Sequence, residues 1–309
     1  MAPVRLCLLG AGRWGQRYID TISTSAGVAL TALASRNPAA AAFVPQDCHI
    51  FTDWREAVRA EDVDAVIVAT PPALHAEMAL AAIAAGRPVL IEKPLTLSLA
   101  EAQAIRDAAR GSHVLASVGH IHLHNGGYLT LKRHLPAIGR LLHIRCEAGN
   151  WGPFRPDVTP LWDWAPHDLS MCLDLVGSAP IAVNCENSAL EQHEAGWAGN
   201  FRLTLDFPGD IKADIRVGNM MATRTRQIEA RGTKGSLVFD DIAHTLTLRR
   251  DKTETTLPVP ATKPLACQID AFAQAVRKRR TRDPALDDGV EIIDILNECE
   301  HQLPHKQMI

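Results

Sequence analysis

Short apolar runs alternate with amphipathic segments over the first 120 residues or so of the chain. The segments that have the length and composition of strands are residues 4–9, 28–34, 49–51, 65–69, 88–91 and 114–118. Most of them lack polar alternation, which is typical of parallel strands covered on both faces. Strands joined by helical crossovers form a parallel sheet with right-handed connections. Residues 1–121 are therefore predicted to form a doubly wound α/β domain, a Rossmann fold.

Helix signals lie between these apolar runs. Leu74 and Met78 recur at helical spacing in an alanine-rich segment, and Gly86 follows at the place of a left-handed C-terminal cap. The sequences DWRE (residues 53–56) and SLAE (residues 98–101) have the spacing of capping boxes. Each of the three signals predicts a helix between two strands.

The pattern changes after residue 121. Extended runs occupy residues 143–148, 182–187, 199–207, 211–216, 224–231, 236–239 and 245–249. Turn-forming sequences at 208–210 (PGD) and 232–235 (GTKG) separate neighbouring runs, as in hairpins. Helices are expected only after residue 166 and near 267–278 and 289–301. Residues 122–309 are thus predicted to form an α+β domain with a large, mostly antiparallel sheet, which would bind substrate and build an oligomer.

Composition and charge narrow the possible partners. The 309 residues are 47% hydrophobic and 22% charged, and the net charge of −3 argues against nucleic acid as a main partner. No apolar run reaches the roughly 18 residues of a membrane span, and residues 1–3 lead into a strand without a signal segment. The seven scattered cysteines contain no C-x-x-C pair. We therefore expect a cytoplasmic protein with reduced thiols and no membrane partner.

A glycine motif follows the first predicted strand directly. Residues 10–15 read GAGRWG, which matches G-x-G-x-x-G with glycines at 10, 12 and 15. A helix is expected to begin at Arg13 and Trp14, so that its free N–H groups would face a pyrophosphate. The strand, motif and helix together predict a dinucleotide site rather than a merely structural turn.

The end of the second strand bears on the choice of dinucleotide. An acid there would hold the ribose 2′-hydroxyl of NAD, but this chain has Ser35, Arg36 and Asn37. An arginine beside a hydroxyl suits a 2′-phosphate, so NADP is favoured and NAD remains possible. Asn37 followed by Pro38 also fits the start of a helix, and the two interpretations are compatible.

Lys93 is the strongest catalytic candidate in the sequence. It follows the apolar strand 88–91 and therefore lies at the carboxyl edge of the sheet, where parallel sheets bind ligands. Pro94 favours extended geometry at Lys93 and makes a cis bond possible. The alternative is a solvated lysine beside a turn proline.

Asp163 and His167 form a second candidate pair. Pro166 fits the first position of a helix that ends near Gly177, which would place His167 in the first turn. There the helix dipole would keep the imidazole neutral and able to act as a base, with Asp163 orienting it. The alternative is that Asp163 only caps the helix while His167 lies at its surface.

His120, His122 and His124 alternate along the chain, so on a strand they would share one face. Three imidazoles raise the possibility of a metal site, but no partner cysteine or H-x-x-x-H pattern accompanies them. We expect no metal, and we expect His120 and His122 to line a substrate pocket.

Taken together, these motifs resemble the Gfo/Idh/MocA family of NAD(P)-dependent sugar and cyclitol oxidoreductases. The resemblance rests on the glycine loop, on ATP (residues 69–71) with His75, on EKP (residues 92–94), and on Asp163 with His167. It implies that Lys93 contacts nicotinamide and substrate and that His167 is the acid/base. It also implies homodimers or homotetramers built through the open face of the second sheet. Further cofactor contacts would come from Thr70, Pro71, His75 and Glu92.

Departures from the family pattern leave the substrate open. The family's D-x-G-x-H-x-x-D pattern is altered at Ala165 and Ser170, and an arginine common near position 123 is Leu123. The predicted function is an NADP-preferring oxidoreductase that moves hydride to or from a secondary alcohol or carbonyl of a sugar-like substrate. The alternatives are a non-catalytic dinucleotide sensor and a glycoside-cleaving elimination that uses the cofactor transiently.

Overall fold

The computed structural model describes residues 2–303. The chain folds into two compact units, of which the first contains residues up to 121 together with 263–293, and the second contains residues 122–262 and the segment from 294 onward. The sequence placed everything after residue 121 in the second domain. The structure differs, because helix α7 (Pro264–Arg277) belongs to the first unit and the division runs through α8 (Pro284–Gln302).

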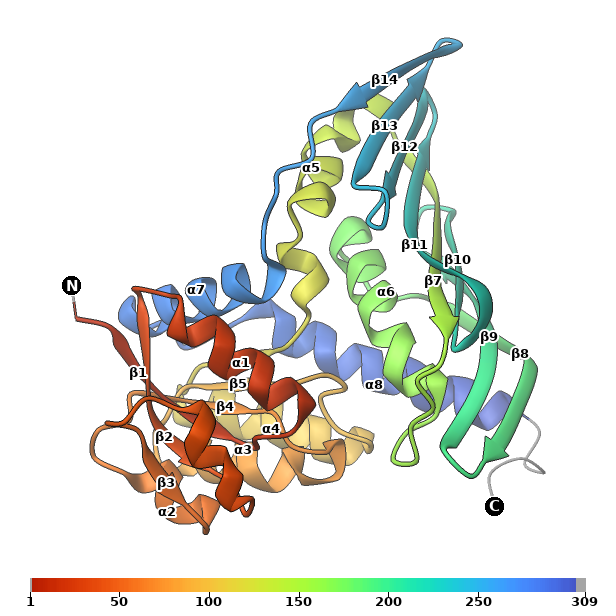
Figure 1. Cartoon of the computed structure of the whole chain (residues 1–309). Coiled ribbons are helices and arrows are strands. Elements are labelled where there is room, and N and C mark those ends of the chain that lie inside the picture. The colour runs from red at the N-terminus through yellow and green to blue at the C-terminus, as the bar shows by residue number, and fades with distance from the viewer. Residues whose placement is uncertain (1, 304–309) are drawn as a thin grey trace. The chain divides into compact units, whose positions relative to one another are not determined.

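The first unit contains a six-stranded parallel sheet in the order β3-β2-β1-β4-β5-β6. Its strands are β1 (Val4–Leu9), β2 (Val28–Ala34), β3 (His49–Phe51), β4 (Ala65–Val68), β5 (Val89–Ile91) and β6 (Ala116–Val118). The strand order reverses between β1 and β4, so this is the doubly wound fold that the apolar runs predicted (Figure 1). The carboxyl ends of β1, β4 and β5 are neighbours at one edge.

The helices of this unit include α1 (Arg13–Ser23), α2 (Trp54–Arg59), α3 (His75–Ala84) and α4 (Leu99–Ser112). The Asp53 carboxylate accepts the Arg55 N–H and caps α2, and Gly86 has φ +69° after α3, so both signals are confirmed. The prediction of a capping box at Ser98 is wrong. Ser98 stands before α4 without a side-chain bond to it, while its carbonyl accepts the Thr96 hydroxyl.

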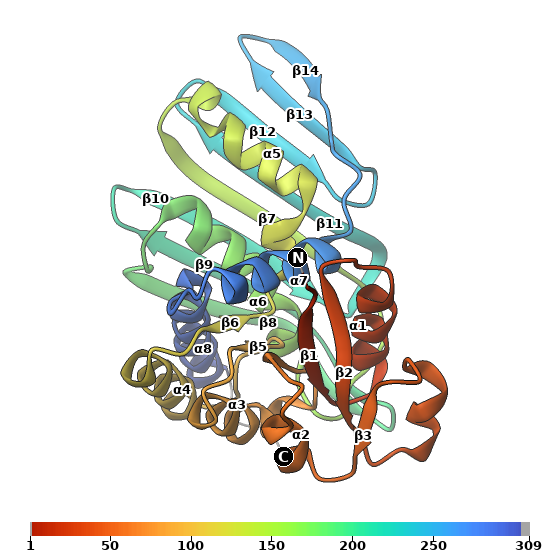
Figure 2. The same ribbon diagram turned by 90° about the vertical axis from the view of Figure 1, so that its left-hand side faces the viewer.

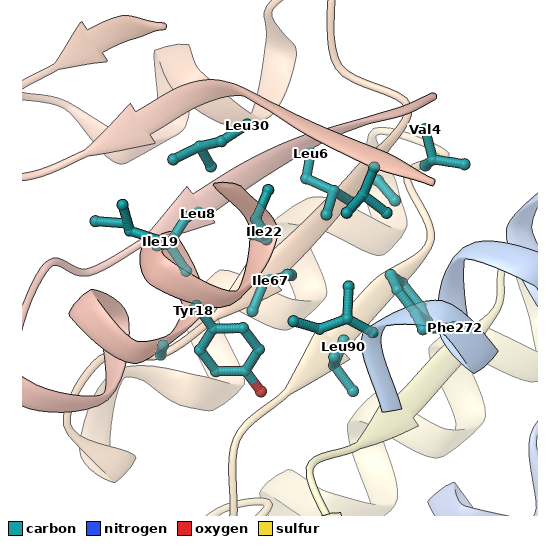
Figure 3. Close-up of a cluster of buried hydrophobic side chains, with 14 of the residues drawn as sticks. Val4, Leu6, Leu8, Tyr18, Ile19, Ile22, Leu30, Ile67, Leu90 and Phe272 are labelled. Atoms are coloured by element: carbon teal, nitrogen blue, oxygen red, sulfur yellow. The ribbon is translucent and has the colours of Figure 1, made fainter. Parts of the chain in front are cut away.

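The core of the first unit explains why α7 returns to it. Phe272 of α7 is 4% exposed and packs with Leu90 of β5 and with side chains of α1 in one apolar cluster (Figure 3). Burying a phenylalanine contributes about 1.5–3 kcal/mol, so a distant helix can be held to the sheet by such contacts. No local sequence pattern indicates which domain that helix joins.

The second unit contains an eight-stranded sheet in the order β14-β13-β12-β11-β7-β10-β9-β8. Its strands are β7 (Leu141–Trp151), β8 (Ala182–His193), β9 (Gly196–Phe207), β10 (Ile211–Gly218), β11 (Met220–Gly232), β12 (Gly235–Asp240), β13 (Thr245–Arg250) and β14 (Thr253–Leu257). β7 and β10 pair parallel and the other pairs are antiparallel, which confirms the mostly antiparallel sheet. The polar β14 was not predicted, because an edge strand needs little apolar surface.

Helices α5 (Gly126–His134) and α6 (Pro160–Val176) cover one face of this sheet, as Figures 1 and 2 show. The sequence did not predict α5, which begins with two glycines. Asn125 caps it by accepting the N–H groups of Gly127 and Tyr128, and a Cβ at Gly127 would meet the Phe239 ring at 2.1 Å. Packing against the sheet therefore overrides the poor helix propensity of glycine.

The cysteines and the helices show two further features. All seven cysteines are free thiols, and six of them are buried. Between residues 2 and 303 we find no helix with both the length and the apolar content that crossing a membrane requires.

Candidate active site

In the glycine loop between β1 and α1, Gly10 and Gly15 are tightly packed, whereas Gly12 is open. Gly10 has φ +101°, and a Cβ there would lie 2.8 Å from the carbonyl oxygen of Ala69; one at Gly15 would lie 2.1 Å from the carbonyl oxygen of Gly10. Gly12 has free space where its Cβ would be, and no side chain caps α1. The turn thus leaves the first N–H groups of α1 available to a phosphate, as a dinucleotide requires.

The loop after β2 carries both features that the sequence suggested for it. Asn37 accepts the Ala39 N–H at 3.0 Å and caps a short 3₁₀ helix (Pro38–Phe43), while Ser35 accepts the Asn37 N–H at 3.1 Å. The Arg36 side chain is exposed. The cap therefore uses Asn37 and leaves the Arg36 guanidinium accessible to a ligand.

Lys93 lies at the same sheet edge. Val68 of β4 pairs with Leu9 of β1 and with Ile91 of β5, so the residues that follow these strands leave the sheet side by side. Those residues include Gly10, Thr70 and Lys93. Lys93 is 8% exposed, which argues against a solvated surface lysine.

His75 contacts two of the loops at this sheet edge. Its ring is fully buried, with Nδ1 2.9 Å from the carbonyl oxygen of Pro94 and Nε2 2.9 Å from that of Thr70. The ring therefore connects the loop after β4 with the loop after β5. His75 can therefore affect cofactor binding through the positions of these two loops.

His167 lies in the second unit, on α6, and the predicted start of this helix is wrong. α6 begins at Pro160 rather than Pro166, so His167 lies beyond the first turn and the helix-dipole argument for a neutral imidazole no longer applies. Two prolines could each open a helix, and the one after Thr159 does so. Pro166 is tolerated inside the helix at the cost of one backbone hydrogen bond.

Asp163 does not cap α6, since Thr159 occupies the cap position. Its Oδ1 accepts Arg155 Nη1 at 2.9 Å, and Arg155 also pairs with Asp157 at 2.6 Å. Asp163 and His167 are four residues apart and therefore share one face of the helix. An arginine that the sequence did not single out thus holds the predicted orienting carboxylate.

The three histidines do not lie on a strand. Residues Ile121–His124 form a 3₁₀ helix, so the strand on which His120, His122 and His124 would share one face is not formed. His122 packs edge-on against His167, with ring centroids 4.6 Å apart and an angle of 79° between planes. His120, in the first unit, is 2% exposed. Over residues 2–303 no cluster of three metal-ligating side chains is present.

A buried acid next to His167 was missed by the sequence reasoning. Asp168 is 1% exposed, and burial raises the pKa of its carboxyl to about 6, although the Arg226 guanidinium on β11 acts in the opposite direction. Arg226 in turn lies over the Trp164 ring, 5.6 Å from its centroid. The available signal was an acid directly after the candidate histidine and directly before the run LSMCL (residues 169–173), but Arg226 is 58 residues away from it.

Comparison with known proteins agrees with this geometry. Residues 4–120 match the Gfo/Idh/MocA oxidoreductase family with its NAD-binding Rossmann fold, and residues 129–238 match a C-terminal domain of the same family. The fold also matches the crystal structure of a protein from Magnetospirillum magnetotacticum MS-1, whose name goes no further than oxidoreductase. The TM-score is 0.88 and the identity 45%, over 96% of this chain and 99% of that one.

Two curated relatives carry more specific names. Inositol 2-dehydrogenase of Klebsiella pneumoniae (strain 342) is 34% identical over 155 residues, 48% of this chain and 46% of that protein. The scyllo-inositol 2-dehydrogenase (NADP(+)) of Bacillus subtilis is 28% identical over 204 residues, 62% of this chain and 56% of that protein. The matched segments span about half the length of these relatives. With both family domains matched in order and a 45% identical relative covered almost completely, the chain belongs to the Gfo/Idh/MocA family of oxidoreductases.

Proposed function

We propose that this protein is an oxidoreductase that prefers NADP(H) and moves a hydride between the nicotinamide and a secondary alcohol or carbonyl of a sugar, cyclitol or sugar derivative. The observation that carries the proposal is the shared sheet edge, where the glycine loop, Thr70 and the buried Lys93 follow three neighbouring strands. This edge suits a dinucleotide with a lysine beside it. The names of the inositol dehydrogenase relatives support the substrate class.

Each candidate residue has a separate chemical task in this proposal. The nicotinamide, when bound, supplies the site to or from which hydride moves. The Lys93 ammonium polarises the reacting oxygen and stabilises the charge that develops on it. His167 exchanges the proton of that oxygen, and Asp163, held by Arg155, orients the imidazole. His120 and His122 contact the substrate.

The preference for NADP(H) rests on Ser35 and the exposed Arg36. A guanidinium can bind a 2′-phosphate with two parallel hydrogen bonds, which a ribose hydroxyl cannot match. The NADP(+) in the name of the Bacillus subtilis relative is consistent with this preference.

A substrate screen tests the proposal. The purified protein would be incubated with sugars, cyclitols and sugar nucleotides and each dinucleotide, and the nicotinamide absorbance followed, with Lys93→Ala as the control. We expect turnover with at least one compound, and turnover lower by about 10² or more in the control. Tight dinucleotide binding without turnover would indicate a sensor instead. Cleavage of a glycoside without net change in absorbance would indicate elimination.

We also propose that the protein forms a homodimer or homotetramer through the sheet face opposite α6. This face is hollowed beside polar and apolar side chains that include Glu147, Asn200, Arg202, Arg216, Met221 and Thr225. Light scattering coupled to gel filtration gives the mass directly. A monomer at micromolar concentration would contradict the proposal.

A further inference from the structure

The carboxyl group next to Lys93 is part of a buried hydrogen-bonded pair. The Tyr18 hydroxyl donates to Glu92 Oε1 at 2.6 Å, across 74 residues of sequence. Tyr18 is completely buried on α1 and Glu92 is 5% exposed at the end of β5. Figure 3 shows the Tyr18 ring among the apolar side chains of the core, with its hydroxyl at the far end of the ring. A charge-assisted bond of this length is among the stronger hydrogen bonds in proteins.

The other half of the Glu92 carboxyl group reaches the catalytic candidate. Its Oε2 accepts the backbone N–H of Lys93 at 3.1 Å, and the Glu92 N–H donates to the Val68 carbonyl at 2.9 Å. Gly119, after β6, comes so close that a Cβ there would lie 3.2 Å from the carboxyl carbon. The carboxyl group is therefore enclosed by α1, β5 and the end of β6, and it has little freedom to move.

The electrostatics show what the hydroxyl contributes. Burial raises the pKa of Glu92, whereas the Tyr18 hydrogen bond, the Lys93 charge and the Lys93 N–H lower it. Tyr18 and Lys93 are both titratable groups that act on this carboxyl. The Tyr18 hydrogen bond thus favours the ionised carboxylate, which is the better acceptor for the Lys93 N–H.

We infer that Tyr18 is a positioning residue for Lys93, acting through Glu92. Its hydroxyl fixes the carboxylate that holds the Lys93 backbone, and it connects that lysine to α1, the helix that begins in the glycine loop. Two hydrogen bonds, from the Tyr18 hydroxyl and from the Lys93 N–H to the Glu92 carboxylate, thus connect α1 to the lysine that would polarise the substrate. The inference rests on the proposed function for the role of Lys93 in turnover.

A merely structural pair would behave differently, and the chain offers a matched control. Tyr128, 1% exposed on α5, donates its hydroxyl to Asp174 Oδ2 at 2.5 Å. Tyr18→Phe and Tyr128→Phe each keep the ring and remove one hydroxyl from a buried tyrosine that donates to a carboxylate, although Asp174 is only partly buried. Both should lower stability to a similar extent, by a few °C in Tm, so a general loss of stability cannot account for a difference between them.

The first measurement does not depend on activity. In protein labelled with ¹⁵N-lysine, the backbone amide of Lys93, assigned by its absence in Lys93→Arg, reports the ionisation of Glu92 through its proton shift. We expect the midpoint of this titration to move to higher pH in Tyr18→Phe and to stay in place in Tyr128→Phe. An unchanged midpoint in Tyr18→Phe would overturn the inference.

The second measurement is turnover on a substrate found by the screen. We expect Tyr18→Phe to lower kcat about tenfold, because a slightly misplaced lysine stabilises the transition state less well, and to leave the dinucleotide Kd within about twofold. Glu92→Gln keeps an acceptor oxygen for the Tyr18 hydroxyl and should lose less than Glu92→Ala. Equal kcat in Tyr18→Phe and Tyr128→Phe, with Lys93→Ala inactive, would overturn the inference. Normal turnover in Lys93→Ala would instead refute the role of Lys93 in the proposed function and leave the amide titration to decide whether Tyr18 acts on Glu92.

Discussion

Each unit places a buried acid next to a candidate catalytic residue, and the two acids are held in different ways. Glu92, beside Lys93, is fixed by a neutral hydroxyl and two backbone contacts. Asp168, beside His167, instead interacts with the charge of the Arg226 guanidinium, which lowers the pKa of its carboxyl. Burial raises the pKa of both carboxyl groups. An acid that accepts hydrogen bonds from a neighbour can fix the geometry of that neighbour, whereas the charge of an acid near a guanidinium sets the local potential, so substitutions should separate the two.

The largest effect is expected at His167. If its imidazole exchanges the proton of the reacting oxygen, His167→Asn keeps a similar shape but should lower kcat by roughly 10² to 10⁴. The pH profile of kcat should lose one ionisation that wild type shows. If the variant retains both the rate and the ionisation, another group must exchange the proton. Lys93, His120 and His122 would then be the next candidates.

The effect of substituting Lys93 on kcat should be nearly as large. Lys93→Ala removes the charge that stabilises the developing oxyanion, so kcat should fall by about 10² to 10³. Fold and dinucleotide binding should persist, because the glycine loop and α1 do not depend on the ammonium group. Circular dichroism and fluorescence titration with dinucleotide check these two points. Near-normal turnover would mean that the buried lysine is only structural.

Asp168 should have a pH-dependent effect on stability. Its carboxyl pKa is raised from 3.8 to about 6 in the fold, so between these values the folded state binds a proton that the unfolded state lacks. The free energy of unfolding must then fall as pH rises through this window. Two pKa units correspond to about 2–3 kcal/mol, by which the difference between wild type and Asp168→Asn should change from pH 4 to 7.

Urea unfolding at several pH values measures this difference. The exposed Glu194→Gln in the same unit serves as the control and should leave the pH dependence of wild type unchanged. A pH-independent difference between wild type and Asp168→Asn would show that Arg226 neutralises the buried charge completely.

The smallest of these effects is expected at the exposed Arg36, on the choice between the two dinucleotides. NADP(H) should bind at least tenfold more tightly than NAD(H), about 1.4 kcal/mol, and Arg36→Ala should abolish that preference. Fluorescence titration with both dinucleotides at two salt concentrations tests this, because contacts of an exposed guanidinium weaken with ionic strength. Equal affinities of wild type for NADP(H) and NAD(H) would contradict the predicted preference.

The candidate catalytic motifs differ in how much of their geometry was predictable. Lys93 follows a strand whose parallel neighbours are set by alternating strands and helices, so its place at the sheet edge followed from the sequence. His167 depends on where α6 begins, and two prolines gave that helix two possible starts. The alternation of His120, His122 and His124 misled for a similar reason, since period two identifies a face only on a strand and the segment forms a 3₁₀ helix.

The sequence by itself determined the doubly wound sheet, the glycine turn, the large second sheet and the edge on which Lys93 lies. These features depend on residue spacing within about 30 positions, where chain geometry leaves few alternatives. Tertiary structure alone decided that α7 joins the first unit, that Tyr18 meets Glu92 across 74 residues, and that Arg226 faces Asp168. Such contacts arise from packing between elements distant in the chain, and packing depends on the shape and burial of whole faces rather than on any local pattern.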